Sequence, residues 1–169
     1  KIANSFLEDN KEYEATVLLG EERDSYDIDG EITSTSDIKP ELSAIEDAIQ
    51  SFNGDIDQIP PMFSAKKVNG KKLYDLARQG KEIERKPKRV WMETEILSYE
   101  YPRLKIKVKC SSGTYIRCIA HELGLMLGCY GCIEQLLRTQ SGRFLLENCY
   151  KLEDLEENSD LASYLIRER

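Results

Sequence analysis

The chain has 169 residues, of which 40% are hydrophobic and 33% charged, and its formal net charge is −7 at pH 7. This length and composition predict one domain with a proper hydrophobic core. The negative balance argues against tight, indiscriminate phosphate binding, and no apolar run approaches the roughly 18 residues that a membrane-spanning helix needs.

The charges are segregated along the chain. Residues 1–64 carry 16 acidic and 4 basic residues, whereas residues 65–89 carry 10 basic and 3 acidic residues, a local net charge of +7. A basic segment in an acidic protein can steer an anionic partner to one face, so nucleic acid is a candidate partner. A solvated loop among charged helices is the competing interpretation.

The first half of the chain predicts a strand, a loop and a helix. Residues 12–19 alternate in polarity, with four residues on the apolar face: Tyr13, Ala15, Val17 and Leu19. The stretch GEERDSYDIDGE is a polar, acidic loop that closes on a turn at Asp29-Gly30. A helix opens at Pro40, with apolar residues at helical spacing, and ends at Gly54.

The second half adds strands and helices without regular alternation, which predicts an α+β fold. The prolines of QIPPMFSA require extended chain. Strands are expected at 90–98 and at 103–110, where the second strand turns a solvated row of basic side chains outward. Helices are expected at about 73–77, from Arg117 to Gly128, and at about 151–157 and 160–168.

The chain has five cysteines and a single histidine, His121. An odd number of cysteines without a signal-like segment indicates a reducing cytosol, so a cytoplasmic location is expected. Cys129 and Cys132 have the spacing of a metal-binding or redox pair, but no second pair accompanies them. We therefore expect a structural role in a tight helix–helix connection, and no metal site.

Four stretches form a specific pattern when they are taken together. They are, in chain order, KEYEATVLLGEERDSYDIDGEI, GDIDQIPPMFSAKKVNGKKLYDLARQG, CSSGTYIRCIAHELG and LLRTQSGRF. Their order and spacing resemble the tRNA pseudouridine synthase B (TruB) family over residues 1 to about 157. Relatives that work with guide RNAs share much of the pattern, and P-P-x-x-S-A-x-K and G-T-Y-I-R are among its elements.

The resemblance implies the pseudouridine synthase fold, a mixed and mainly antiparallel sheet flanked by helices. It also implies an activity, in which uridine 55 of the tRNA T arm is isomerised by glycosidic bond cleavage, base rotation and rejoining through carbon. In the family, the arginine of G-T-Y-I-R, matched by Arg117, pairs with the catalytic aspartate. The role is physically reasonable, because a carboxylate in a water-excluded pocket would otherwise take up a proton. Taken alone, Arg117 could equally be a solvent-exposed or helix-capping residue.

The resemblance implies further catalytic and pocket residues. Tyr13 matches the tyrosine beneath the flipped base, where its ring would stack on uracil. Asp27 matches an aspartate linked electrostatically to the arginine, and Tyr115 and Leu136 match residues that line the base pocket. Without the resemblance, Asp27 would be read as part of an acidic turn, and a calcium loop would lack its bidentate glutamate. The other three residues would then pass as ordinary core.

Four basic residues are candidate phosphate contacts, with solvated charge as the equally simple interpretation: Lys66, Lys67, Arg138 and Arg143. The expected partner is tRNA, bound through its T-arm stem-loop. No metal or organic cofactor is expected, because a carboxylate and a positioned base suffice for the chemistry. The protein is expected to be a monomer.

The sequence also departs from the family pattern. The family's catalytic aspartate lies in a G-x-L-D-P stretch upstream of the Tyr13 strand, and these 169 residues contain no Asp-Pro dipeptide. We therefore expect a fragment, with residues 1–150 as a partial catalytic domain, residues 151–169 as a helical tail and no PUA-type RNA-binding domain. Arg23-Asp24-Ser25 stands where the family has T-D-T.

The missing aspartate leaves two classes of function open. The intact protein is expected to be a tRNA pseudouridine synthase, while this chain alone is expected to form no pseudouridine. The alternative is a non-catalytic RNA-binding or tRNA-folding module that keeps the cleft without the chemistry. A guide-RNA-dependent homologue is a third option. An Asp-Pro-containing segment before Lys1 in the parent gene would favour the enzyme.

Overall fold

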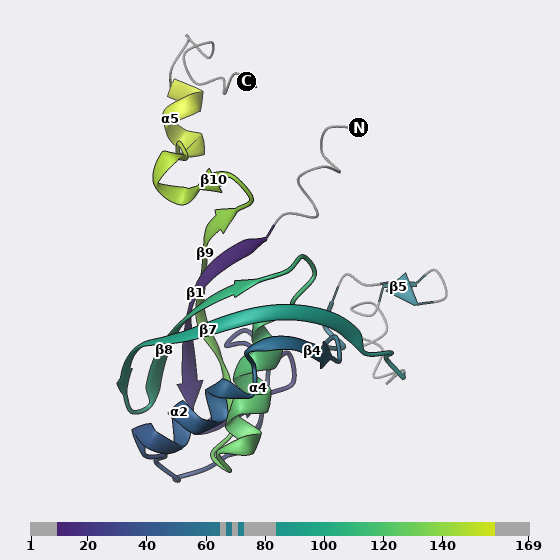
Figure 1. Cartoon of the computed structure of the whole chain (residues 1–169), viewed down its shortest axis with the longest axis vertical. Coiled ribbons are helices and arrows are strands. Elements are labelled where there is room, and N and C mark those ends of the chain that lie inside the picture. The colour runs from purple at the N-terminus through teal and green to yellow at the C-terminus, as the bar shows by residue number, and fades with distance from the viewer. Residues whose placement is uncertain (1–9, 65–66, 69–70, 73–83, 158–169) are drawn as a thin grey trace.

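A computed structural model describes residues 10–64, 67–68, 71–72 and 84–157, which form an α+β fold. A six-stranded sheet in the order β10-β9-β1-β8-β7-β4 carries two helices on one face (Figure 1). All strand pairs of this sheet are antiparallel. The expected fold class is confirmed. The strands are β1 (Lys11–Leu19), β4 (Gly54–Gln58), β7 (Lys88–Glu100), β8 (Arg103–Cys110), β9 (Gly131–Ser141) and β10 (Phe144–Leu145).

Strands β1 and β8 form the centre of the sheet because their apolar residues alternate in step. Ala15 pairs with Ile106 and Val17 with Leu104, and all four side chains are buried. Paired residues of antiparallel strands point to the same face, so this register creates a continuous apolar surface. The strands predicted at 12–19 and 103–110 are confirmed.

Helices α2 (Leu42–Gln50) and α4 (Ile116–Met126) cover that apolar surface (Figure 1). Each presents an apolar stripe at three- and four-residue spacing, which is the pattern of a helix with one buried face. The buried residues are Ile45, Ala48 and Ile49 in α2, and Ile116, Cys118, Ile119, Ala120, Leu123 and Gly124 in α4. The core is therefore the layer between the helices and the sheet.

The opposite face of the sheet carries rows of alternating charge. Lys109 of β8 pairs with Glu12 of β1 on one side and with Glu93 of β7 on the other, and Lys107 is flanked by glutamates in the same way. Opposite charges at directly paired positions stabilise a sheet by roughly 0.2–1 kcal/mol each. The basic row of β8 is thus a solvated face, as predicted, and the neighbouring strands neutralise it.

The remaining elements are short. Strands β2 (Glu21–Arg23) and β3 (Ile32–Thr35) form a hairpin, and β5 (Lys67–Val68) pairs with β6 (Lys71–Lys72). The 3-10 helix η1 (Leu146–Asn148) precedes α5 (Leu152–Glu157), which confirms a helix near 151–157. The helices expected at 73–77 and 160–168 lie outside the described residues. In the part of the chain that the structure describes, no helix is long and apolar enough to cross a membrane.

Two sequence-based expectations are wrong. The stretch expected to be a single acidic loop, residues 20–31, contains β2 and leads directly into β3, because Glu21 pairs with Thr35 across it. The connection at Cys129–Cys132 leads from α4 into a strand, β9, rather than into a second helix. The sequence of β9, GCIEQLLRTQS, shows no clean alternation. It becomes a strand because β1 pairs along its length and β10 pairs with its end.

Two glycines allow α4 to approach the first residues of β9. A Cβ on Gly124 would overlap the backbone of Tyr130 and Gly131, and a Cβ on Gly131 would lie 2.7 Å from the Ala120 carbonyl oxygen. Both residues are buried. This contact between backbones sets the position of α4, and therefore of Arg117, relative to β9.

Candidate active site

Arg117 lies in the first turn of α4 and joins that helix to two other segments. Its Nη1 donates to Asp27 Oδ2 at 2.6 Å and to the Ser25 carbonyl oxygen at 3.0 Å, and Nη2 donates to the Phe63 carbonyl oxygen at 2.7 Å. The side chains of Arg117 and Asp27 are each 23% exposed. The expected contact between these two residues, which are 90 positions apart, is found.

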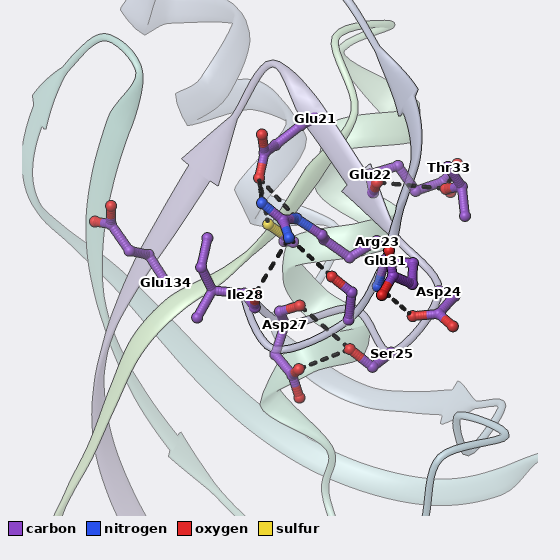
Figure 2. Close-up of polar contacts among 12 residues, drawn as sticks. Glu21, Glu22, Arg23, Asp24, Ser25, Asp27, Ile28, Glu31, Thr33 and Glu134 are labelled. Atoms are coloured by element: carbon purple, nitrogen blue, oxygen red, sulfur yellow. Dashed lines mark hydrogen bonds and ion pairs between the residues drawn. The ribbon is translucent and has the colours of Figure 1, made fainter. Parts of the chain in front are cut away.

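Asp27 belongs to residues 24–31, defined here as the acidic loop because it contains Asp24, Asp27, Asp29 and Glu31. Arg23, the last residue of β2 before the loop, holds it in shape, since its Nη1 donates to the carbonyl oxygens of Ile28 at 3.2 Å and Gly30 at 2.8 Å (Figure 2). Glu21 Oε1 accepts from Nε and Nη2 of the same guanidinium at 2.8 and 2.7 Å. Hydrogen bonds from a charged donor are stronger than neutral ones, so Arg23 defines the shape of the loop.

The position of Asp27 is defined on both its backbone and its carboxylate. The Ile28 N–H donates to the Ile133 carbonyl oxygen at 2.9 Å, and the Ile133 N–H donates to the Tyr26 carbonyl oxygen at 3.0 Å. This parallel bridge attaches the acidic loop to β9. The Ser25 hydroxyl donates to Asp27 Oδ1 at 2.7 Å (Figure 2), so each carboxylate oxygen accepts a hydrogen bond.

A pocket of about 530 Å³ opens beside the ion pair. The acidic loop lines it together with Phe63 and Arg117, and Arg117 is the one basic residue among the described residues of that lining. Among the described residues, the hydrogen bonds of Arg117 use Nη1 and Nη2, and Nε has no acceptor.

Tyr115, expected in the base pocket, is held by a residue that the sequence did not single out. The side-chain amide of Gln58 accepts from the Tyr115 N–H at 2.7 Å and donates to the Tyr115 carbonyl oxygen at 3.0 Å. Gln58 is only 2% exposed, and it binds both backbone groups as a neighbouring strand would. The contact orients the chain as it enters α4, two residues before Arg117.

Tyr13, Leu136 and Arg138 lie on the face of the sheet that carries α4. Tyr13 pairs with Arg138 and Ala15 pairs with Leu136, so these side chains share the side of buried Ala15. Leu136 is nevertheless 46% exposed, and Arg138 is exposed as well. Burial, together with Cys110, raises the pKa of Tyr13, and the Arg138 guanidinium partly offsets this shift.

Tyr13, Leu136 and Arg138 lie on β1 and β9, the strands that also carry the bridge to the Asp27–Arg117 ion pair. Val17 pairs with Ile133, the residue that bridges to Asp27, and Tyr13 lies four residues earlier on the same strand face. At about 3.3 Å per residue, this places Tyr13 roughly 13 Å along β1 from the bridge. Tyr13 and Arg117 are therefore on the same side of the sheet, although they are not in direct contact.

Of the four candidate phosphate contacts, the structure describes the side chains of Arg138 and Arg143. Lys66 lies outside the described residues, and Lys67 is the first residue of β5, where only its backbone is described. Arg143 is exposed, and its guanidinium carbon lies 5.4 Å from the centre of the Phe144 ring. Arg138 is the candidate whose position beside Tyr13 is defined.

His121 lies one turn after Arg117 on α4, beside the acidic loop. Its ring stacks on that of Tyr26, with centroids 3.8 Å apart and planes inclined by 9°. Nδ1 lies 3.1 Å from Glu22 Oε1, but it is buried and makes no hydrogen bond to any described residue. Burial lowers the pKa of His121 below its ordinary value, and the Glu22 carboxylate offsets only part of this effect.

We expect the free energy of unfolding to decrease as the pH is lowered from about 7.5 to about 5.5. The folded pKa of His121 lies below the ordinary 6.5, so the unfolded chain binds a proton that the folded protein resists. The contribution is complete above 6.5 and is lost as the pH falls from there through the folded pKa. Urea unfolding at each pH, followed by the fluorescence of Trp91, the single tryptophan, measures this change.

His121→Phe is the matched control, because it keeps an aromatic ring against Tyr26 and cannot titrate. Burial raises the pKa of Glu122, which acts in the opposite direction, so the difference between the two proteins isolates His121. A variant whose pH dependence equals that of the wild type would show that His121 does not control stability in this range.

Cys129 and Cys132 are structural by their environment. All five cysteines are free, and Cys129 and Cys132 are buried. Burial raises the pKa of Cys132 to about 11, so its thiol is a poor nucleophile near neutral pH. Within the described residues, no group of three or more histidine, cysteine, aspartate or glutamate side chains is arranged to hold a metal ion.

The sheet, the two helices and the ion pair define an α+β protein with a candidate catalytic centre at the start of α4. The family model for the N-terminal domain of TruB family pseudouridylate synthases matches residues 1–116. The family model for the C-terminal domain of tRNA pseudouridylate synthase B matches residues 117–167. The chain belongs to the TruB family, and the resemblance inferred from the four motifs is confirmed.

Relatives and solved structures agree with this assignment. The chain is 48% identical to tRNA pseudouridine synthase B of Protochlamydia amoebophila, covering 99% of this chain and 64% of that protein. It is 48% identical to tRNA pseudouridine synthase B of Chlamydia pneumoniae, covering 98% of this chain and 71% of that protein. The chain thus spans about two thirds of the length of these relatives. The crystal structure of a Cbf5-Nop10-Gar1 complex contains a similar fold, with a TM-score of 0.66, 26% identity and coverage of 91% of this chain and 37% of that chain.

Sequence reasoning missed Gln58, Tyr26 and His121, although each lies within a stretch that carried the resemblance. Gln58 directly precedes the Ile-Pro-Pro sequence, and Tyr26 directly precedes Asp27. His121 follows Arg117 by four residues, which places both on one helix face. That spacing was the signal that could have identified His121.

Proposed function

We propose that the protein converts uridine to pseudouridine in tRNA, at the T-arm position known as uridine 55. The observation that carries the proposal is the Asp27–Arg117 pair, which lies beside a pocket of about 530 Å³. Tyr13, Tyr115 and Leu136, which lie outside the lining of that pocket, are the proposed contacts of the extruded base. The TruB membership of the chain and the names of its relatives support this substrate.

Arg117 is proposed to hold the reacting carboxylate. Asp27 and the carbonyl oxygens of Ser25 and Phe63 use Nη1 and Nη2, while Nε has no acceptor among the described residues. A guanidinium with unused N–H groups can bind a second carboxylate and keep it ionised in a water-excluded site. In the family this carboxylate is the catalytic aspartate of the G-x-L-D-P stretch.

Asp27 is proposed to orient the arginine rather than to react. Both of its oxygens already accept hydrogen bonds, from Ser25 and from Arg117. A carboxylate held in this way aligns the guanidinium and balances its charge before substrate arrives. Such alignment matters because electrostatic stabilisation depends on groups that are in place before the reaction.

Tyr13 is proposed to stack on the extruded uracil, with Leu136 as an apolar neighbour. Extruding a base costs a few kcal/mol, and an aromatic stacking face offsets about 1–3 kcal/mol of this cost. The partly buried ring of Tyr13 and the 46% exposed side chain of Leu136 lie on the same sheet face. Arg138, which is exposed next to Tyr13, is a proposed phosphate contact.

The proposal includes a cytoplasmic location, a monomeric state and a reaction without metal or organic cofactor. The five free cysteines agree with a reducing compartment. Residues 1–150 are proposed to belong to the catalytic domain, with residues 151–169 as a helical tail. The activity belongs to the full gene product that contains this chain.

Conversion of a T-arm stem-loop by the full gene product tests the proposal. We expect pseudouridine at position 55, and no product when that uridine is replaced by cytidine. Binding without conversion would support the non-catalytic RNA-binding module. A protein that neither binds nor converts the stem-loop would overturn both functions.

Phosphate and base contacts are expected to differ in their response to salt. Lys66→Ala combined with Lys67→Ala should weaken stem-loop binding and flatten the slope of log K against log salt, by about 0.9 per lost duplex contact or 0.7 per single-strand contact. Tyr13→Ala should leave the slope unchanged and cost roughly 1–3 kcal/mol of stacking. Fluorescence anisotropy of a labelled stem-loop across a salt series measures both quantities.

A matched control for the lysine variant lies on the opposite face of the sheet. Lys105 and Lys109 are exposed there, so Lys105→Ala combined with Lys109→Ala removes the same charge away from the proposed cleft. Equal slopes for the wild type and the Lys66/Lys67 variant would remove the basic segment from the RNA-binding face.

A further inference from the structure

The acidic loop is attached to α4 at two points, not one. Arg117 and His121 are four residues apart on α4, and side chains at this spacing lie above one another on one helix face. Tyr26 and Asp27 are consecutive residues of the loop. Asp27 pairs with Arg117, while Tyr26 stacks on His121. We define these four residues as the clamp.

The Tyr26–His121 stack restricts a tilt of the acidic loop against α4 that the Asp27–Arg117 ion pair leaves possible. The bridge to Ile133 holds the loop backbone on β9, but on its α4 side a loop attached only through the Arg117 side chain could still tilt about that contact while the ion pair stays closed. A ring stack with centroids 3.8 Å apart and planes inclined by only 9° restricts the tilt, because the aromatic planes would have to separate.

The backbone of Tyr26 has a conformation with a local energetic cost. Its φ is +65°, a left-handed conformation that costs a residue with a side chain roughly 1–2 kcal/mol. Glycine would adopt this conformation without that cost. Backbone hydrogen bonds hold the turn, from the Tyr26 N–H to the Arg23 carbonyl oxygen at 3.0 Å and from the Ile133 N–H to the Tyr26 carbonyl oxygen at 3.0 Å. A glycine at this position would avoid the cost of the positive φ but would lack the ring that stacks on His121.

We propose that Tyr26 and His121 are positioning residues, which set the angle at which Asp27 meets Arg117 and thereby orient the guanidinium toward the pocket. The catalytic part of this inference rests on the proposed function. The geometric part, that the stack controls the Asp27–Arg117 contact, does not depend on it. Neither residue needs to touch the substrate.

Tyr26→Gly separates the positioning role from ordinary stability. The variant removes the ring but suits the positive φ, so it should fold with little loss of stability. We expect the Arg117 side-chain Nε–H signal of the 169-residue chain to shift toward that of Asp27→Asn in ¹⁵N NMR spectra. In the full gene product, kcat should fall roughly 100-fold with KM nearly unchanged, the order of loss expected for a displacement of about 1 Å.

Conservative variants provide the rescue. Tyr26→Phe and His121→Phe keep aromatic planes in contact, so we expect wild-type Arg117 signals and kcat within about threefold of the wild type. Tyr150→Gly is the control for the loss of a ring, because Tyr150 is 58% exposed and lies between η1 and α5, outside α4, β9 and the acidic loop. It should leave both the Arg117 signal and kcat unchanged.

The NMR comparison tests the clamp, and pseudouridine formation tests the proposed function. An Arg117 signal in Tyr26→Gly that matches the wild type would overturn the clamp, and so would a Tyr26→Phe variant as perturbed as Tyr26→Gly. A full gene product that forms no pseudouridine would defeat the proposed function instead. The NMR comparison would then still decide whether the stack positions Asp27.

Discussion

Replacing Arg117 with alanine is expected to abolish pseudouridine formation and to lower the free energy of unfolding by about 2–3 kcal/mol. The substitution leaves the Asp27 carboxylate and the carbonyl oxygens of Ser25 and Phe63 without their donor. Removing one partner of a buried ion pair typically costs 3–5 kcal/mol, and we take a lower value because water reaches both side chains. Pseudouridine formation and urea unfolding measure the two effects.

Arg117→Lys should recover part of the stability and little of the activity. A lysine keeps the charge but is a compact donor, whereas the planar guanidinium serves three acceptors from two segments at once. The Asp27→Asn variant completes a double-mutant cycle with Arg117→Ala. A coupling energy of about 1–3 kcal/mol is expected for residues in direct contact.

Two results would contradict this account. A coupling energy near zero would mean that Asp27 and Arg117 act independently, despite their 2.6 Å contact. Full activity in Arg117→Ala would remove the arginine from the catalytic centre. The acidic loop would then be a surface turn that Arg23 shapes by itself.

Gly124→Ala is expected to destabilise the fold by more than about 4 kcal/mol, enough to prevent recovery of folded protein. The added methyl group would overlap the backbone of Tyr130 and Gly131, which are parts of the chain that cannot rotate away as a side chain can. Alanine is favoured over glycine within a helix by about 1 kcal/mol, so intrinsic propensity predicts the opposite sign. Urea unfolding followed by Trp91 fluorescence measures the loss.

Gly128→Ala is the control for this substitution. Gly128 has a φ of +67°, and a Cβ there would meet nothing within 4 Å. Only the backbone cost of roughly 1–2 kcal/mol is therefore expected. A Gly124→Ala variant as stable as Gly128→Ala would show that α4 does not rest directly on the start of β9.

This helix–strand contact also matters for the candidate centre. Gly124 and Arg117 lie on the same helix, and Gly131 and Ile133 lie on the same strand. The acidic loop is bonded to Ile133, so the α4–β9 distance sets how far Arg117 must reach to Asp27. A mild substitution at this contact should therefore change the ion pair before it unfolds the protein.

The sequence by itself determined the class of fold, the central strands and the two main helices. Strands β1 and β8 alternate with a period of two, and α2 and α4 repeat their apolar residues every three or four positions. Such periods are visible in a short window, because burial of one face selects them locally. The four motifs similarly pointed to the family and to Arg117 and Asp27 as neighbours.

Only the tertiary structure decided β9, the β2–β3 hairpin and the surroundings of the ion pair. Strand β9 has no clean alternation and depends on β1 for its pairing. Gln58 meets Tyr115 across 57 residues, and Tyr26 meets His121 across the same fold. Contacts of this kind leave no local period in the sequence, because each is made by a pair of residues that the chain brings together only after the sheet and α4 have formed.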